Sequence, residues 1–375
     1  MVSVSNFVSI LGATLAIIVG IFISPIPQNL GFYRFLTSKI PEFVGMIPLF
    51  HDKTEWQFTY EELYKNCDTI SGQTALVTGA NSGVGYETAR ALAKCGVDVT
   101  LACRNAERCS IAAEEIKKES MDNGYQNDVS TMIVDTSSLQ SVQTFSNDFL
   151  TKHKDGSLDM LYLNAGMMKS GRNSSDNKLA LSKDGIELVF ATNYLGHHLM
   201  YRLLEPLLLN SKMARVIQTS SNASYMTFKY KVATRLESLN NPTTFFFTDL
   251  KNYGQSKLAQ ILWTKHLTKR LEDSKNIFVN VCHPGAVNTP LVDKVLPAFL
   301  IPLVNIVREK ILWSREEGAL TQLYLGVATD ALATKNIRGK YFHPQAQEVV
   351  NPLSLDEQLQ SDLWEFSEEL ISEFL

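Results

Sequence analysis

Two residues whose types suit proton transfer, Tyr253 and Lys257, lie four positions apart in the segment YGQSK. On a helix, this spacing places both side chains on one face. A cationic ammonium close to a phenol favours the ionised phenolate, so we expect Lys257 to lower the pKa of Tyr253 towards neutrality. Tyr253 would then act as a general acid or base in the interconversion of a hydroxyl and a carbonyl group. Such a pair is common on helix surfaces, so the interpretation depends on its context.

Two further polar residues would complete a proton-transfer site with this pair. Ser221 follows a predicted strand at 215–219 and can donate a hydrogen bond to the same substrate oxygen. Asn193 falls in a predicted helical stretch at 184–209, where we expect its side-chain amide to hold a water molecule in relay to Lys257. The predicted catalytic set is Asn193, Ser221, Tyr253 and Lys257.

A glycine-rich turn lies upstream, in the segment QTALVTGANSGVGYETA. An apolar strand at 74–78 enters the turn, Gly79, Gly83 and Gly85 form it, and a helix leaves it from Tyr86. Glycine permits left-handed backbone angles and close approach to a ligand, and a helix N-terminus binds anions. The spacing G-xxx-G-x-G differs from the common dinucleotide fingerprint G-x-G-x-x-G. It is typical of a phosphate cradle, with a purely structural turn as the alternative.

Strands alternate with helices along the chain. We expect strands at 74–78, 97–103, 129–135, 158–163, 215–219 and 277–282, and helices at 106–120, 139–153, 184–209, 253–271 and 314–328. This alternation indicates right-handed βαβ units and a parallel sheet. The predicted fold class is α/β, a doubly wound, Rossmann-type sheet in a single domain at 71–375.

In such a sheet, ligands bind outside the carboxyl ends of the strands. The second predicted strand ends at Arg104, and an arginine there suits the extra phosphate of NADP, whereas an acidic residue would suit NAD. A solvated loop cation is the alternative reading of Arg104. The third strand ends at Asp135, which can accept a hydrogen bond from an adenine amino group, and the fourth at Asn164, Ala165 and Gly166, where a backbone has to pass a cofactor.

These motifs together resemble the short-chain dehydrogenase/reductase superfamily: TGANSGVG at 78–85, NAG at 164–166, Tyr253 with Lys257, and HPGAVNT at 283–289. The phrases LACRN, ELVFATNYLGHHLM, YGQSKLAQILWTKHL and LWEFSEEL are similar to its retinol dehydrogenase-like branch and to WW-domain oxidoreductases. The resemblance implies an NADP(H) cofactor, membrane attachment and lipophilic alcohols or aldehydes as substrates. It also implies that HPGAVNT closes the site over nicotinamide. The predicted cofactor-binding residues are Gly79, Asn81, Ser82, Gly83, Val84, Gly85, Arg104, Asn105, Asp135, Thr136, Asn164, Ala165, Gly166, Tyr253, Lys257, Pro284, Gly285, Val287 and Thr289.

Two stretches depart from the family pattern. Leu163 stands where the family usually has the first asparagine of NNAG, and LYLNAG is also similar to sterol keto-reductases of the same superfamily. The segment 222–249, with Phe245, Phe246 and Phe247, does not read like the usual loop of the branch and would form either a pocket wall or a loop core.

Composition excludes some classes of function. The net charge of -4, without a Lys/Arg-rich run, argues against a nucleic-acid partner. The five cysteines are odd in number and scattered, which argues against a disulfide framework and against a zinc site and suits a reducing compartment. We therefore expect no metal.

The amino-terminal residues 7–23 are almost wholly apolar, and no charged side chain precedes Arg34. We expect an uncleaved membrane helix within an anchor at 1–30, with a signal peptide and a buried core helix as alternatives. A linker with a short helix at 52–66 would follow at 31–70. Arg34 and Lys39 favour a cytosolic catalytic domain, on the endoplasmic reticulum or a lipid droplet.

An apolar segment at 295–307 falls within the region where the family has its substrate lid, at about 286–313. We expect a lid that touches the bilayer and admits a lipophilic substrate, with a buried hairpin as the alternative. His197 and His198 are assigned only a packing role, and an amphipathic helix at 355–375 is expected to close the fold. The prediction allows for a homodimer.

The sequence thus predicts an NADP(H)-dependent oxidoreductase that passes hydride between nicotinamide and a retinoid-like, polyprenoid or sterol alcohol or carbonyl. In this reading, Tyr253 is the general acid/base and Lys257 also holds the nicotinamide ribose. The alternatives are a non-catalytic, membrane-bound scaffold that senses the cofactor and a sterol keto-reductase of the same superfamily.

Overall fold

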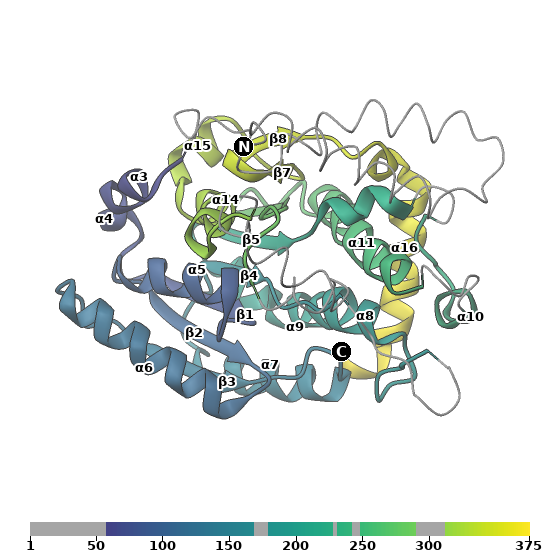
Figure 1. The fold of residues 1–375 in the computed structure, drawn as a ribbon, viewed down its shortest axis with the longest axis horizontal. Helices are drawn as coiled ribbons and strands as arrows, with labels where there is room; N and C mark the ends of the chain where they lie inside the picture. The colour runs from purple at the N-terminus through teal and green to yellow at the C-terminus, as the bar shows by residue number, and fades with distance from the viewer. Residues whose placement is uncertain (1–57, 169–178, 228–230, 242–247, 290–311) are drawn as a thin grey trace, which may run out of the picture. The chain divides into compact units, whose positions relative to one another are not determined.

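In the described part of the chain, eight strands form one mixed sheet in the order β3-β2-β1-β4-β5-β6-β7-β8 (Figure 1). The computed structural model describes residues 58–168, 179–227, 231–241, 248–289 and 312–375. Every described strand pair is parallel except β7 with β8. The strands are β1 (Thr74–Thr78), β2 (Asp98–Cys103), β3 (Val129–Ile133), β4 (Met160–Leu163), β5 (Ala214–Thr219), β6 (Ile277–Cys282), β7 (Tyr341–His343) and β8 (Gln347–Val349). The chain turns back from β3 to β4 beside β1, which creates the crevice where such sheets bind ligands.

The predicted doubly wound, Rossmann-type α/β fold is confirmed. All six expected strands are present, with ends that shift by two residues at most. The prediction omits β7 and β8, which have three residues each and flank the short 3₁₀ helix η6 (Pro344–Ala346). Segments this short carry no alternating apolar pattern, so nothing in the sequence marks them as strands.

Helices pack on both faces of the sheet and form its two main buried clusters. On β1, Leu76 belongs to a cluster with α7 (Leu139–Lys152), α9 (Gly196–Leu209), α11 (Thr248–Arg270) and α16 (Glu357–Ile371). Its neighbours Ala75 and Val77 point to the opposite face and join α5 (Gly83–Ala93), α6 (Ala106–Asp122) and α14 (Arg315–Val327). Since both faces are covered, every residue of β5 and β6 is buried, including the polar residues Arg215, Gln218 and Asn280. The smaller helices are α3 (Tyr60–Lys65), α4 (Cys67–Ile70), α8 (Leu188–Phe190), α10 (Leu236–Asn240) and α15 (Thr329–Thr334), with 3₁₀ turns η4 (Asn222–Thr227), η7 (Pro352–Leu355) and η8 (Ser372–Phe374).

The predicted helix at 184–209 is interrupted. It divides into α8, a π-helix η3 (Ala191–Leu195) and α9. π-Helical turns are frequent at functional sites, and this one contains Asn193. The glycine turn also differs in detail, because α5 begins at Gly83 rather than at Tyr86.

The carboxyl-terminal helix α16 packs along α11 and α9, as the sequence predicts (Figure 1). Its Ser367 hydroxyl is hydrogen-bonded to the Tyr194 hydroxyl at 2.8 Å, and Glu368 lies 2.8 Å from His198 Nε2. Trp364 packs against the same surface, with the Arg270 guanidinium 4.8 Å from its ring centroid. This helix closes the core from one side.

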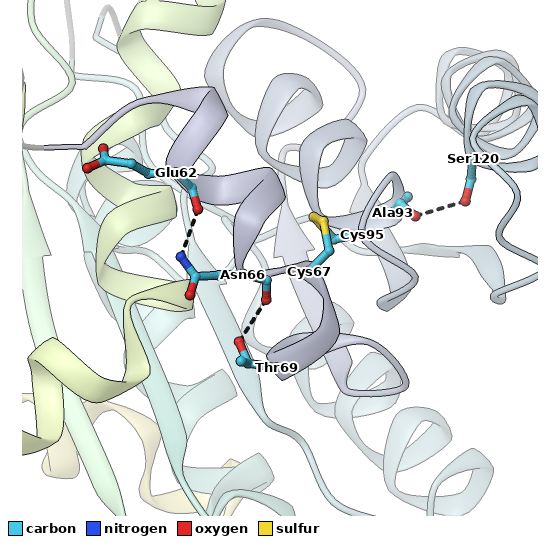
Figure 2. Close-up of a disulfide and its surroundings, with 7 residues drawn as sticks. All are labelled: Glu62, Asn66, Cys67, Thr69, Ala93, Cys95 and Ser120. Atoms are coloured by element: carbon cyan, nitrogen blue, oxygen red, sulfur yellow. Dashed lines mark hydrogen bonds between the residues drawn. A yellow bond between two sulfur atoms is a disulfide. The ribbon is translucent and has the colours of Figure 1, made fainter.

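Four of the five cysteines are paired, so the prediction of no disulfide framework is wrong. Cys67, at the start of α4, bonds to Cys95, in the turn between α5 and β2, with 4.6 Å between their Cα atoms (Figure 2). Cys103 bonds to Cys109, and Cys282 is free and buried. Cys67 and Cys95 meet because α5 carries the chain back past α4. Their spacing in the sequence does not show this proximity.

Three sequence predictions fall outside the described residues: the apolar helix at 7–23, the segment with Phe245, Phe246 and Phe247, and most of the lid, including 295–307. In the part of the chain that the structure describes, no helix is long and apolar enough to cross a membrane. The described part of the helix predicted at 52–66 is α3, which begins with a capping box between Thr59 and Glu62.

Candidate active site

The long helix α11 presents Tyr253 and Lys257 to the sheet, as their spacing predicts. Both side chains are buried, with exposed fractions of 8% and 4%. Lys257 Nζ lies 5.4 Å from the centroid of the Tyr253 ring and donates a hydrogen bond to the Thr219 carbonyl oxygen at 2.7 Å. The carbonyl at the end of β5 therefore orients the ammonium group over the face of the phenol ring.

Ser221 directly follows this end of β5 and meets Tyr253. The two side chains are hydrogen-bonded, and Ser221 Oγ also accepts from the Ala223 backbone N–H at 3.2 Å. Ser221 is half-buried, so its hydroxyl group lies between the protein interior and the open side of the site. The structure thus brings together three of the four predicted catalytic residues. The Ser221 hydroxyl is next to the Tyr253 phenol, and the Lys257 ammonium group lies over the phenol ring.

The protonation behaviour of the pair differs from the sequence-based expectation. Burial raises the pKa of Tyr253 to about 12, against a smaller lowering by the hydrogen bond to Ser221. Burial also lowers the pKa of Lys257 to about 7, with the Cys282 thiol opposing the shift. The prediction that Lys257 brings the pKa of Tyr253 towards neutrality is therefore wrong for this structure. The reason is that burial disfavours the charged form of each group, the phenolate of Tyr253 and the ammonium of Lys257.

Asn193 is fully buried in the π-helix, and its side-chain amide is engaged within the protein. Its Nδ2 group donates to the Met167 carbonyl at 2.8 Å and to Ser256 Oγ at 2.9 Å, and its Oδ1 accepts from the Met167 N–H at 2.8 Å. Both amide hydrogens are used, so they do not hold the relay water that the sequence predicts. Asn193 instead clamps the segment after β4 to helix α11.

The glycine turn at the end of β1 has the features of an anion cradle. Gly79 and Gly83 have φ angles of +68° and +60°, which favour glycine. A Cβ atom on Gly85 would lie 2.4 Å from Asn164 Nδ2, so a side chain does not fit there. Ser82, the N-cap of α5, makes no side-chain capping hydrogen bond. By contrast, Asn105 caps α6 and Ser138 caps α7.

The first turn of α5 therefore offers its N–H groups to a ligand, and a phosphate group suits them. The predicted residues Asn81 and Ser82 lie in the turn, and Val84 is buried in the first turn of α5. The residues present thus fit a dinucleotide.

The segment after β4 links this cradle to the catalytic residues. Asn164 Nδ2 donates to the Thr78 carbonyl at 2.9 Å, and Ala165 Cα would lie 3.0 Å from a Cβ atom on Gly79. A Cβ atom on Gly166 would lie 3.6 Å from Lys257 Nζ, so this glycine lies beside the catalytic lysine. Leu163, the departure from the family pattern, is fully buried in the apolar core, where an asparagine is not needed.

The remaining predicted cofactor residues lie at the expected strand ends but differ in exposure. Arg104 is exposed, and Asn105 accepts from the Arg108 N–H at 2.8 Å as the N-cap of α6. Asp135 Oδ1 accepts from the Ser137 hydroxyl at 2.7 Å, while Thr136 is buried with its carbonyl against Gly196. Arg104 is thus an exposed charged group directly after β2.

Some residues of the HPGAVNT segment pack in the interior, and others border the candidate site. Gly285 and Val287 lie against Trp313, and Gly285 has a φ angle of +90°. Pro284 is half-buried between them and His283. Thr289 reaches the cradle, since its Cγ2 would lie 3.0 Å from a Cβ atom on Gly83. This segment therefore borders the cradle at Gly83, whereas the segment after β4 borders it at Gly79 and Gly85.

Sequence reasoning missed three residues that connect these parts. Thr78 accepts hydrogen bonds from the Asn164 and Ala165 N–H groups, both at 2.9 Å. Gln260, one turn after Lys257, donates to the Asn193 carbonyl at 2.8 Å. His197 is bonded at both ring nitrogens, so the assignment of packing alone is incomplete. In the sequence, the only sign of a role for these three residues is their position. Each is next to a predicted site residue or one helical turn from one.

Comparisons with known proteins agree with this geometry. The family model for short chain dehydrogenases matches residues 73–233. Retinol dehydrogenase 14 of Mus musculus is 33% identical over 309 residues, covering 80% of this chain and 86% of the relative. The WW domain-containing oxidoreductase of Gallus gallus is 31% identical and covers 88% and 75%, respectively.

Solved structures share the fold. A crystal structure of an uncharacterised protein from Mycobacterium paratuberculosis has a TM-score of 0.59, with 26% identity, and the match covers 81% of this chain and 94% of that one. A short chain dehydrogenase from Escherichia coli CFT073, complexed with NADPH, has a TM-score of 0.55 at 21% identity, and the match covers 74% and 98%. With the relatives above, these findings lead to one conclusion: the chain belongs to the short-chain dehydrogenase/reductase superfamily, in its retinol dehydrogenase-like branch.

Proposed function

We propose that the protein is an NADP(H)-dependent oxidoreductase that passes hydride between nicotinamide and a lipophilic alcohol or carbonyl. One observation carries this proposal: Tyr253, Lys257 and Ser221 converge beside the end of β5, next to a glycine cradle that fits a dinucleotide. Membership of the family supports an oxidoreductase that uses NAD(P)(H). Our proposal adds three points to this: a preference for NADP(H), a lipophilic class of substrate, and a role for each of the three side chains.

The roles of the three side chains follow from their chemistry. The bound cofactor supplies or accepts the hydride. Tyr253 transfers the proton, because its hydroxyl group is next to that of Ser221 and its raised pKa keeps it protonated at neutral pH. Ser221 orients the substrate oxygen by a hydrogen bond, and Lys257 holds the nicotinamide ribose and supplies positive charge near the phenol ring.

Arg104 supports the preference for NADP(H). It is exposed directly after β2, where its guanidinium group can pair with the 2′-phosphate. The neighbouring residue Asn105 is a helix cap, and the first acidic residue after β2 is Glu107, which lies in the first turn of α6 and not directly at the strand end. Asp135 and Thr136 would border the adenine, as proposed from the sequence.

A lipophilic substrate and membrane attachment are supported by the apolar segments at 7–23 and 295–307 and by the similarity to retinol dehydrogenase 14. We propose that residues 1–30 anchor the chain in the endoplasmic reticulum or on a lipid droplet. Arg34 and Lys39 favour a cytosolic catalytic domain. The two disulfides favour an oxidising compartment instead. A count of thiols in the protein taken from its native membrane separates these two orientations.

The test is NADPH oxidation by the full-length protein in detergent or lipid vesicles, with retinoid, polyprenoid and sterol carbonyls offered in parallel. We expect turnover with at least one class and a lower rate with NADH. If NADPH binds tightly and none of these carbonyls is reduced, the protein is instead a scaffold that senses the cofactor. Turnover of sterol ketones alone would assign it to the sterol keto-reductase activity.

A further inference from the structure

His197 is a fully buried side chain that lies between the two halves of the site. It follows Asn193 by one helical turn. Its Nδ1 atom is 3.1 Å from the Asn193 carbonyl oxygen, and its Nε2 atom is 3.1 Å from the Thr78 hydroxyl. One ring therefore contacts both the π-helix that carries Asn193 and the last residue of β1 before the glycine turn.

The partners determine which ring nitrogen carries the proton. The Asn193 carbonyl can only accept a hydrogen bond, so His197 Nδ1 is the donor and Nε2 is the acceptor. The Thr78 hydroxyl accepts from the Asn164 and Ala165 N–H groups, and its single hydrogen is shared between two acceptors, the Tyr162 carbonyl oxygen at 3.2 Å and His197 Nε2 at 3.1 Å. Burial and the nearby Lys257 lower the pKa of His197 to about 3, so the ring is neutral at physiological pH.

Each end of the ring holds a group that shapes the site. Thr78 positions Asn164 and Ala165 against the glycine turn, where Ala165 Cα would lie 3.0 Å from a Cβ atom on Gly79. The Asn193 carbonyl also accepts from Gln260, which is on the same helix as Lys257 and one turn beyond it. The route from the cradle to the catalytic helix thus runs Thr78, His197, Asn193 and Gln260.

We propose that His197 is a positioning residue that keeps the dinucleotide cradle in register with the catalytic helix α11. The proposal deepens, and for its kinetic consequence rests on, the proposed oxidoreductase function. Since displacement of reacting groups by about 1 Å can cost about a hundredfold in rate, loss of this register should affect the chemical step.

Two variants of His197 each remove one of the two hydrogen bonds of its ring. His197→Asn places an amide N–H near the Nδ1 position and loses the contact to Thr78. His197→Gln places an amide near the Nε2 position and loses the contact to Asn193. His198→Gln is the matched control, because His198 is equally buried and bonded at both nitrogens, but to Trp263 in the later part of α11 and to Glu368 on α16, and not to the glycine turn or to Asn193.

The first measurement is kinetic. We expect either His197 variant to lose about tenfold or more in kcat, while the NADPH Kd changes by less than about twofold. His198→Gln should keep kcat even if it lowers the melting temperature to the same extent. If kcat follows the melting temperature in all three variants, His197 has a packing role only and the proposal fails.

The second measurement, amide hydrogen exchange, does not need turnover and so separates this inference from the proposed function. We expect both His197 variants to speed exchange at the Asn164 and Ala165 amides as well as across residues 191–195. Faster exchange only at the end whose contact is broken would overturn the proposal, even if wild-type protein turns over its substrate. Faster exchange at both ends would support it, even if no carbonyl on the panel is reduced.

Discussion

Lys257 Nζ lies over the ring of Tyr253, 5.4 Å from its centroid, and its donated hydrogen bond goes to the Thr219 carbonyl. The ammonium group therefore contacts the phenol through its ring face. Burial affects both groups, raising the pKa of Tyr253 to about 12 and lowering that of Lys257 to about 7. The pair is thus arranged to keep a proton on the phenol at neutral pH.

This arrangement predicts opposite pH dependences for the two directions of the reaction. Carbonyl reduction needs the protonated phenol, which persists because its pKa is raised, so its single-turnover rate should not rise between pH 7 and 10. Alcohol oxidation needs the phenolate, whose fraction grows with pH below the pKa, so its rate should increase throughout this range. Single-turnover fluorescence of NADPH measures both rates.

The same experiment can contradict the structural account. An oxidation rate that reaches a plateau below about pH 8 would place the pKa of Tyr253 near neutrality, as the sequence alone predicts. Lys257→Met serves as the control, because it removes the only other group of the pair that titrates in this range.

A second prediction concerns the choice of cofactor. Arg104→Asp removes a positive charge at the end of β2 and supplies an acceptor for ribose hydroxyls. We expect the KM for NADPH to rise by about tenfold to a hundredfold and the KM for NADH to fall, because hydrogen bonds between charged groups contribute about 1.5–3 kcal/mol. Steady-state kinetics with both cofactors measures the change.

Lys118→Asp provides the matched control for Arg104. Lys118 is equally exposed on α6 and undergoes the same change of charge near the other end of that helix. Its cofactor preference should stay that of the wild type. If both variants shift the cofactor preference equally, the cause is the change in the protein's overall electrostatic field and not the loss of a contact made by Arg104.

A third prediction tests the disulfide between Cys67 and Cys95. It closes a loop with a sequence separation of 28, so its loss should lower the free energy of unfolding by about 3–4 kcal/mol. Urea unfolding of Cys67→Ser/Cys95→Ser against wild type measures the loss. In the presence of a strong reductant, the two proteins should differ far less.

Thiol counting gives an independent check. Unfolded, unreduced protein should expose one thiol per chain, that of Cys282, since the other four cysteines are paired. Five reactive thiols would show that the pairs do not form in the isolated protein, and would favour the reducing compartment expected from the sequence.

Local patterns predicted those parts of the molecule that depend on local chemistry. The turn with Gly79, Gly83 and Gly85 needs special backbone angles or close packing, and these leave a visible signature in the residue types. The spacing of Tyr253 and Lys257 likewise predicted that both would share one helix face. The six parallel strands could be predicted because each is a short segment rich in apolar and β-branched residues that alternates with a helical pattern.

Features that depend on distant contacts could not be predicted. The pairing of Cys67 with Cys95 and the link from His197 to Thr78 join segments that only the tertiary fold brings together. The pKa of Tyr253 was predicted in the wrong direction, because the sequence shows a neighbouring charge but not the degree of burial. The π-helix around Asn193 has no periodic signal distinct from that of an α-helix.

In the proposed reaction, the Tyr253 hydroxyl transfers the proton during hydride transfer. Tyr253→Phe removes that hydroxyl and keeps the buried ring beside Val189 and Ala223. Tyr201→Phe is the matched control, because it removes another buried hydroxyl, one bonded to Glu205 on α9 and to none of the four predicted catalytic residues.

The most direct measurement is the single-turnover rate of NADPH oxidation, with the carbonyl substrate that the wild type reduces best, together with the Kd for NADPH. We expect Tyr253→Phe to lose about a hundredfold to ten-thousandfold in rate with a nearly unchanged Kd, and Tyr201→Phe to keep both. A Tyr253→Phe protein that retains more than about a tenth of the wild-type rate would contradict this role of Tyr253.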